Sequence, residues 1–135
     1  MRIFLDANIL FSAALPHRLM QAFLNLIMER GECLTNAYAV EEARRNLAGK
    51  FPESVGSLER LTQRCELITQ LTTSLGAELP LKDVSILGVA IAGGATHLLT
   101  GDERDFGKYW GQKIQGVKIV SPRMLAEELQ LRQRK

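Results

Sequence analysis

The chain has 135 residues, of which 46% are hydrophobic and 24% charged, so it is long enough to form a domain with a buried core. This composition excludes a disordered protein and a disulfide-rich secreted scaffold. The formal net charge of +2 is too small to indicate nucleic-acid binding by itself. We expect a single domain over residues 1–130 and a basic, frayed tail over residues 131–135.

The cysteines and the apolar segments indicate where the protein functions. Cys33 and Cys65 have neither the spacing of a disulfide framework nor the CxxC pairs of a zinc site, so we expect reduced, buried thiols. Asp6 and Asn8 interrupt the apolar N-terminal stretch, which argues against an export signal. The uncharged run over residues 84–99 is too short and too polar to span a membrane. The sequence therefore predicts a cytoplasmic protein without a membrane segment.

Short apolar runs alternate with amphipathic segments in the N-terminal half, a pattern typical of a parallel α/β sheet. In chain order we predict a strand at 2–5, a helix from Leu19 to just before Gly31, a strand at 33–34, a helix from the Asn36 cap to about Gly49, and a helical stripe from Leu58 to Ile68. The last turn of that stripe is also compatible with the start of a strand through Leu71.

The alternation continues after a loop around Gly76 and Pro80. Asp83 stands where an N-cap belongs, ahead of a buried helix predicted over residues 84–92. The remaining predicted elements are a strand at 96–100, a turn at Gly101-Asp102, a strand at 117–120, and a final helix capped by Ser121 and begun by Pro122. The whole pattern predicts a three-layer α/β/α domain around a central parallel sheet.

The acidic residues supply the first indication of chemistry. Asp6 follows the first predicted strand, Asp102 follows the strand at 96–100, and Asp83 begins the helix before that strand. Groups just past the carboxyl ends of parallel strands meet at one edge of a sheet, so we expect these carboxylates to converge with Glu41 or Glu42. Such a cluster is costly without a cation, because like charges raise each other's pKa. An oxygen-only ligand set favours Mg²⁺ or Mn²⁺ over zinc.

Four segments carry a family resemblance, namely Ile3–Leu10, Asn36–Arg45, Lys82–Leu87 and Leu98–Phe106. In this order they are similar to the successive motifs of the PIN-domain nucleases, and especially to those of the VapC-type toxins of type II toxin-antitoxin systems. Each motif alone is weak, but the ordered set spans nearly the whole chain. The resemblance implies a PIN-like α/β/α fold and a small ribonuclease that uses one or two Mg²⁺ or Mn²⁺ ions.

The resemblance also implies roles for individual residues. The four acidic positions of the family, both catalytic and metal-binding, correspond to Asp6, Glu42, Asp83 and Asp102. Asp105 corresponds to a further metal ligand or a ligand-orienting group, and Asn8 and Thr100 match polar residues that hold the site together. Ordinary structural roles are equally open to single acids, because Asp6 and Asp83 can cap helices and Asp102 can form a turn.

Two features make the match incomplete. Many family members carry a hydroxyl residue at the position of Ala7, so one hydrogen bond near the site is expected to be missing. Glu41 is an alternative to Glu42, because either side chain can pair with Arg44 or Arg45 on the same helix. The register of the motif favours Glu42.

An acidic centre that acts on RNA needs basic groups nearby to hold the phosphates. The candidates are Arg44, Arg45, Lys50, Arg104 and Lys108. Phe106, Tyr109 and Trp110 could stack on unpaired bases, or instead belong to the core or to a dimer interface. His17 and His97 have no serine or cysteine partner in a recognisable arrangement, so we assign them no catalytic role.

These observations predict a metal-dependent endoribonuclease that hydrolyses RNA phosphodiester bonds. The resemblance further implies a homodimeric toxin restrained by a small antitoxin. The alternatives are an RNA-processing PIN-like nuclease that is not a toxin, a nucleic-acid-binding module with degenerate chemistry, and a phospho-acceptor receiver domain. A receiver would need an acidic pair at the first strand and a lysine after the last strand, where this chain has Ser121-Pro122. A haloacid-dehalogenase-like phosphatase would need an aspartate at the position of Asn8.

Overall fold

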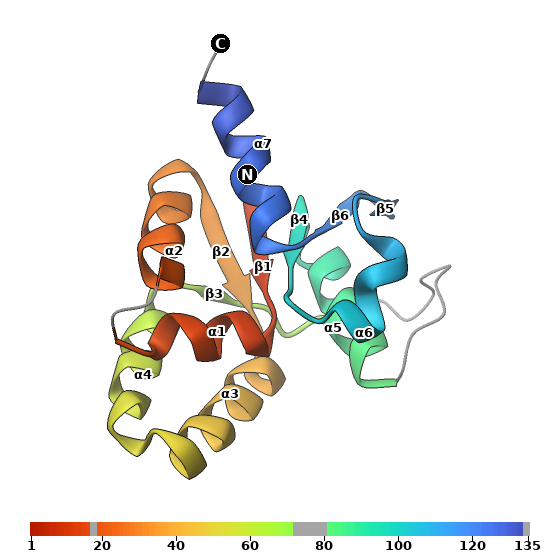
Figure 1. Cartoon of the computed structure of the whole chain (residues 1–135). Helices are drawn as coiled ribbons and strands as arrows, with labels where there is room; N and C mark the ends of the chain where they lie inside the picture. Colours follow the sequence, from red (N-terminus) through yellow and green to blue (C-terminus); the bar gives the residue numbers. More distant parts are fainter. Residues whose placement is uncertain (17–18, 72–80, 134–135) are drawn as a thin grey trace.

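The computed structural model describes residues 1–16, 19–71 and 81–133, with only the backbone described at 81–85 and 131–133. Helices and strands alternate along this part of the chain (Figure 1). The N-terminal elements are β1 (Arg2–Leu5), α1 (Ala7–Ala14), α2 (Leu19–Arg30), β2 (Glu32–Thr35), α3 (Ala37–Lys50), the 3-10 helix η1 (Pro52–Ser54), α4 (Val55–Gln63) and β3 (Glu66–Leu67). The C-terminal elements are α5 (Leu81–Ala92), β4 (His97–Leu99), α6 (Glu103–Phe106), the 3-10 helix η2 (Gly107–Tyr109), β5 (Lys113–Ile114), β6 (Val117–Val120) and α7 (Pro122–Gln133).

The described strands form one sheet in the order β3-β2-β1-β4-β6-β5. Every pairing is parallel except that of β5 with β6. Strand β5 is an antiparallel addition to the edge, joined to β6 by a two-residue turn in which Gln115 and Gly116 both have positive φ. The receiver domain has a different strand order, in which the first strand lies between the second and the third. Here β1 lies between β2 and β4, so the topology argues against the receiver hypothesis.

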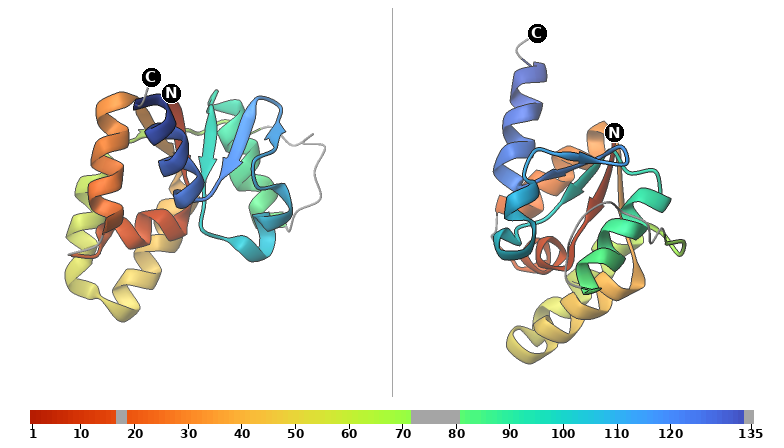
Figure 2. Two further views of the ribbon diagram at one scale, coloured as in Figure 1. Left: turned by 45° about the horizontal axis from the view of Figure 1, so that its top comes forward. Right: turned by 90° about the vertical axis from the view of Figure 1, so that its right-hand side faces the viewer.

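Helices cover both faces of the sheet, which makes three layers. Helices α1, α2 and α7 lie on one face and α5 lies on the other (Figures 1 and 2). The central strands β1 and β4 are buried, as a parallel sheet covered on both faces requires, and Phe4, Leu5, Leu98 and Leu99 have no exposed surface. The predicted α/β/α architecture with a mainly parallel sheet is therefore confirmed.

Several element boundaries differ from the sequence-based expectations. Helix α5 begins at Leu81, so Asp83 lies inside its first turn and the prediction of Asp83 as N-cap is wrong. Helix α4 ends at Gln63 and is followed by β3 at residues 66–67, so a strand does begin at the end of that segment, but it stops at Leu67 and does not reach Leu71. Helix α7 includes residues 131–133 of the predicted tail. The predicted loop around Gly76 and Pro80 lies outside the described residues.

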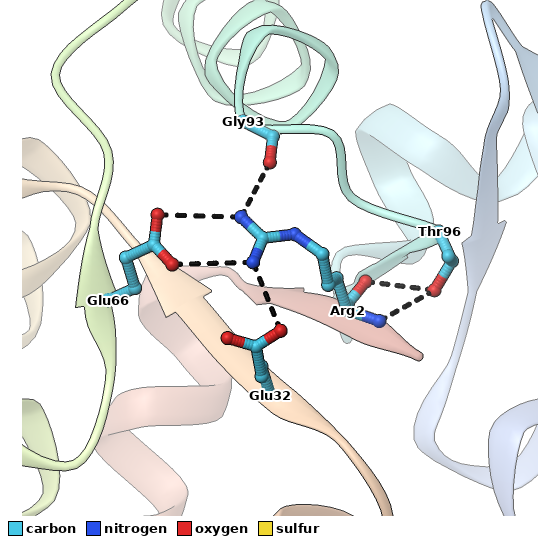
Figure 3. Close-up of polar contacts among 5 residues, drawn as sticks. All are labelled: Arg2, Glu32, Glu66, Gly93 and Thr96. Carbon is cyan, nitrogen blue, oxygen red and sulfur yellow. Dashed lines mark hydrogen bonds and ion pairs between the residues drawn. The ribbon is translucent and has the colours of Figure 1, made fainter.

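At the amino ends of the strands, Arg2 joins three separate segments (Figure 3). Its guanidinium donates to Glu32 on β2 at 3.2 Å, to Glu66 on β3 at 3.3 and 3.4 Å, and to the carbonyl of Gly93 after α5 at 2.7 Å. The Arg2 N–H also donates to the Thr96 hydroxyl at 3.0 Å. These contacts fix the short edge strand β3 against the sheet and stabilise the edge opposite to the carboxylates.

Candidate metal centre

Asp6 is the first residue after β1 and is only 6% exposed. Its Oδ1 accepts the Ala7 N–H at 2.8 Å, which caps α1, and its Oδ2 accepts the Thr100 hydroxyl at 2.8 Å. Burial raises the pKa of Asp6, the hydrogen bonds from Thr100 and Ala7 lower it, and the charges of Glu42 and Asp102 raise it, with a net increase. Asp6 thus caps a helix and is also a buried carboxylate whose ionised form is disfavoured by its surroundings.

Asn8 and Thr100 connect the segment after β1 to the segment after β4. The Asn8 side chain accepts the Gly101 N–H at 2.8 Å and donates to Thr100 Oγ1 at 3.3 Å and to Asp6 Oδ2 at 3.4 Å. Thr100 Oγ1 in turn accepts the Asp102 N–H at 3.1 Å. The two residues therefore hold Asp6 and Asp102 in a fixed relation, which is the kind of support that metal-binding carboxylates require.

Asp102 begins α6 as its N-cap, and its Oδ1 accepts the Asp105 N–H at 3.0 Å. The cap leaves Asp102 half-buried, with its side chain lining the same pocket as Asp6. Asp105 is half-buried but does not line this pocket. The structure thus brings Asp102 to the site and leaves Asp105 beside it.

Helix α3 supplies the third carboxylate of the pocket. Asn36 caps this helix by accepting the Ala39 N–H at 2.9 Å, and Glu42 lies further along the helix on the side that lines the pocket. Glu41 instead forms an ion pair with Arg44, whose Nε donates to its Oε2 at 3.0 Å. This placement favours Glu42 over Glu41 as the site residue.

Asp6, Glu42 and Asp102 therefore line one small pocket at the carboxyl ends of the strands. The complete lining is Asp6, Ala7, Asn8, Tyr38, Ala39, Glu42, Ile86 and Asp102. The cavity volume of about 20 Å³ is enough for one or two water-sized particles. Ile86 comes from α5, and Asp83 precedes it by three residues, a spacing that places both on one face of the helix. The side chain of Asp83 lies outside the described residues.

The donor set can be tested for its fit to a divalent cation. Among the described side chains, no group of three or more His, Cys, Asp or Glu residues is placed so that it could hold a metal ion. However, Asp6 is buried beside two other carboxylates, and no described lysine or arginine forms an ion pair with any of the three. All of the carboxylate donors are oxygen atoms, which fits a hard cation such as Mg²⁺ or Mn²⁺.

None of the candidate RNA-contacting residues lines the pocket. Arg44, Arg45 and Lys50 are exposed on α3, while Arg104 and Lys108 are exposed on α6 and η2. Arg44 is held by Glu41, and Lys108 lies 5.2 Å from the centre of the Tyr109 ring in a cation–π contact. Arg44 and Arg45 follow Glu42 by two and three residues on α3, and Arg104 follows Asp102 by two. Lys50 is further away along the chain, at the last residue of α3, and Lys108 is on η2, from which no residue lines the pocket.

The aromatic residues differ from expectation. Phe106 has no exposed surface and belongs to the core, so stacking of RNA on its ring is excluded. Tyr109 and Trp110 are half-buried and pack against the core. Tyr38, which was not among the predicted site residues, is 45% exposed and lines the acidic pocket. Its position one helical turn before Glu42 was the signal available in the sequence.

Neither the cysteines nor the described histidine belongs to the pocket. Cys33 is buried and Cys65 half-buried, both are free thiols, and burial raises their pKa to about 12 and about 11 respectively. His97 is buried at the amino end of β4, where its ring nitrogens contact Thr96 Oγ1 at 2.8 Å and Glu128 at 3.1 Å. His17 lies outside the described residues. No helix in the described part of the chain is both long and apolar enough to cross a membrane.

Comparison with known proteins identifies the class of fold. No family model and no curated protein matches the sequence. Among solved structures, the chain is similar to a chain in the crystal structure of VapBC2 from Rickettsia felis bound to a DNA fragment from their promoter. The TM-score is 0.66 at 20% sequence identity, and the alignment covers 90% of this chain and 98% of that chain. The likeness shows that the chain has a PIN-like three-layer α/β/α fold.

Proposed function

We propose that this protein is a metal-dependent endoribonuclease of the VapC type and the toxin of a toxin-antitoxin pair. The observation that carries the proposal is the buried Asp6 carboxylate, held by Thr100 and Asn8 in a pocket with Glu42 and Asp102. Asp6 is buried next to the negative charges of Glu42 and Asp102, which is unfavourable without a cation. Helix capping accounts for Asp6 and Asp102 but not for Glu42, which lies inside α3 and lines the same pocket. The similarity of the fold to that of a chain of VapBC2 also supports the proposal of a VapC-type nuclease.

In the proposed reaction, Asp6, Glu42 and Asp102, together with Asp83 on α5, hold Mg²⁺ or Mn²⁺. Such an ion activates the attacking water and offsets negative charge on the phosphate during hydrolysis. Asp6 and Asp102 are the rigid members of this set, because Thr100 contacts both residues. Glu42 is on a separate helix and holds or orients a further ion or the attacking water. Asp105 contributes through its N–H bond to Asp102, which fixes the orientation of that carboxylate.

The proposal assigns the exposed cations to substrate binding. Arg45, Lys50, Arg104 and Lys108, with Arg44 when it is released from Glu41, would contact phosphates of the RNA on either side of the pocket. These contacts act on charge and do not read sequence. They therefore explain how a polyanion approaches an acidic centre without defining the cleavage sequence.

A cleavage assay tests the proposed activity. The purified protein should cleave RNA in Mg²⁺ or Mn²⁺ and lose the activity in chelator. Glu42→Gln should lose most of the activity, whereas Glu41→Gln, a matched change on the same helix outside the pocket, should retain it. Asp6→Asn should be inactive. Equal cleavage in chelator and in metal would refute the metal mechanism, and equal loss in both glutamine variants would refute the assignment of Glu42.

The proposed partners are a small antitoxin and a second copy of the chain. The solved neighbour was crystallised as VapBC2 on promoter DNA, which supports an antitoxin as partner. Expression in a bacterial cytoplasm should arrest growth, and co-expression of a small protein encoded next to this chain should relieve the arrest. Arrest by Asp6→Asn as well would contradict a toxic nuclease, whereas cleavage without arrest would favour an RNA-processing nuclease. Light scattering of the purified chain tests the homodimer.

A further inference from the structure

Tyr38 lines the acidic pocket from the first turn of α3. Its side chain is 45% exposed, which makes it the most exposed aromatic residue of the chain. Most other aromatic rings contribute to packing. Phe4 and Phe106 are fully buried, and Phe51 makes an edge-to-face contact with Phe11 at 6.1 Å between ring centres. The ring of Tyr38 is thus only partly buried by the core, and it lies beside the carboxylates of the pocket.

The position of Tyr38 on the helix relates it directly to the proposed chemistry. Tyr38 and Glu42 are four residues apart, and Arg45 follows Glu42 by three, so the three residues form one stripe along α3. Tyr38 and Glu42 both line the pocket, and Arg45 is exposed further along the helix. The stripe therefore presents a flat ring, a carboxylate and a cation in sequence, beginning at the pocket.

We propose that Tyr38 stacks on an unpaired base of single-stranded RNA and thereby positions the adjacent phosphodiester at the carboxylates. The inference rests on the proposed function and adds to it a residue that positions the substrate. Aromatic rings bind unpaired bases of any sequence through their π-faces. A duplex would hide these faces, so an exposed ring in the lining of the pocket selects unpaired strands. Arg45 is then placed to contact a phosphate on the same strand.

Three substitutions of Tyr38 distinguish stacking on RNA from a purely structural role of the side chain. Alanine has the highest helix propensity, so Tyr38→Ala at this exposed position should cost little stability. The phenol hydroxyl is not needed for stacking, so Tyr38→Phe should retain it. Tyr38→Leu keeps apolar bulk and removes the ring, which makes it the matched control for hydrophobic contact without stacking.

Kinetics on a single-stranded RNA test the inference. Stacking contributes about 1–3 kcal/mol per base, so Tyr38→Ala and Tyr38→Leu should raise KM by about fivefold or more. Their kcat should change much less, and Tyr38→Phe should resemble the wild type. Removing one base from the RNA near the cleaved bond should reproduce the increase in KM for the wild type and add nothing in Tyr38→Ala. Urea denaturation should give the same midpoint for all four proteins.

A binding assay separates this inference from the proposed function. In the non-cleaving Asp6→Asn background, an RNA carrying 2-aminopurine should lose fluorescence on binding when Tyr38 is present and keep it in the Tyr38→Ala double variant. Quenching without cleavage by the wild type would support the stacking site and refute the nuclease. Cleavage with an unchanged KM and unchanged fluorescence in Tyr38→Ala, or a preference for duplex RNA, would overturn the inference.

Discussion

Asp6 shows how a single residue serves both the fold and the candidate site. Its two carboxylate oxygens accept from the Ala7 N–H and the Thr100 hydroxyl, each at 2.8 Å. These bonds offset part of the cost of burial, yet the pKa of Asp6 remains raised because burial is the largest effect. Without a cation, the ionised form of Asp6 is therefore less favourable in the folded protein than in the unfolded chain.

This imbalance predicts a pH dependence for the metal-free protein. The pKa of folded Asp6 lies above its ordinary value of 3.8, so the folded state binds the proton more tightly than the unfolded state. Its contribution to stability is full below pH 3.8 and is lost as the pH rises through the raised pKa. Asp6→Asn lacks this titration. In chelator, the urea midpoint of the wild type relative to Asp6→Asn should fall as the pH is raised from about 4 to 7.

The control for this experiment is Asp105→Asn, which changes an aspartate outside the pocket. The urea midpoint of the wild type relative to Asp105→Asn should change much less with pH than its midpoint relative to Asp6→Asn. A wild-type midpoint that rises over this pH range relative to Asp6→Asn would mean that capping of α1 outweighs burial. That result would contradict the unfavourable burial of the ionised Asp6 carboxylate, on which the metal proposal depends.

The sequence located some site residues better than others. Asp6 and Asp102 were predictable, because Asp6 directly follows an apolar run that reads as a strand and Asp102 stands in the turn after another such run. The choice between Glu41 and Glu42 depends on the rotation of α3 about its axis, which tertiary packing determines and neighbouring residues in the sequence cannot resolve. Tyr38 was missed for a related reason, since its spacing of one helical turn from Glu42 becomes informative only once Glu42 is known to face the pocket.

At the scale of elements, periodicity predicts the long segments and fails for the short ones. Strands β3 and β5 contain two residues each, too few to produce a pattern. They form because the edges of β2 and β6 are free to pair with nearby segments of the same polypeptide. Helix α1 is missing from the predicted order of elements, although Asp6 was considered as a helix cap, because its apolar residues continue those of β1 and its burial hides the amphipathic pattern. Tertiary structure, rather than local propensity, defines these elements.

The short strand β3 therefore depends on contacts from outside itself, and Arg2 supplies several of them. Arg2→Leu removes the bonds to Glu32, Glu66 and the Gly93 carbonyl. Because the arginine is partly exposed, we expect a loss of about 1 kcal/mol in the free energy of unfolding. The Ile68 N–H, which donates to the Thr35 carbonyl at 2.9 Å beside β3, should exchange with deuterium faster. Hydrogen exchange followed by NMR measures this directly.

The matched control is Arg123→Leu on α7. Arg123 also pairs with a glutamate, Glu127, at 3.2 Å, but its side chain is 89% exposed. That change should leave both stability and the exchange of Ile68 nearly unchanged. Equal effects of the two substitutions would show that loss of charge, and not the loss of contacts that join β1, β2 and β3, is responsible.

At the scale of the whole molecule, the small net charge conceals an uneven distribution. The chain has 17 basic and 15 acidic residues, and the proposed site uses four of the acids. With a cation bound, those four are neutralised in part, and the rest of the surface carries a clear excess of positive charge. A net charge of +2 is thus compatible with a protein that binds RNA. Because a bound cation would neutralise part of the acidic cluster, the stability of the fold should depend on metal.

Metal binding should therefore stabilise the whole protein. A cation that binds only the folded state adds about 2.7 kcal/mol to the free energy of unfolding at a concentration 100 times its Kd. Mn²⁺ should raise the melting temperature of the wild type above its value in chelator, and Glu41→Gln should behave in the same way. Asp6→Asn should lose most of this increase, because its amide is a weaker ligand for a hard cation than a carboxylate. An equal increase in Asp6→Asn, measured by calorimetry, would place the metal elsewhere on the surface and refute the pocket as its site.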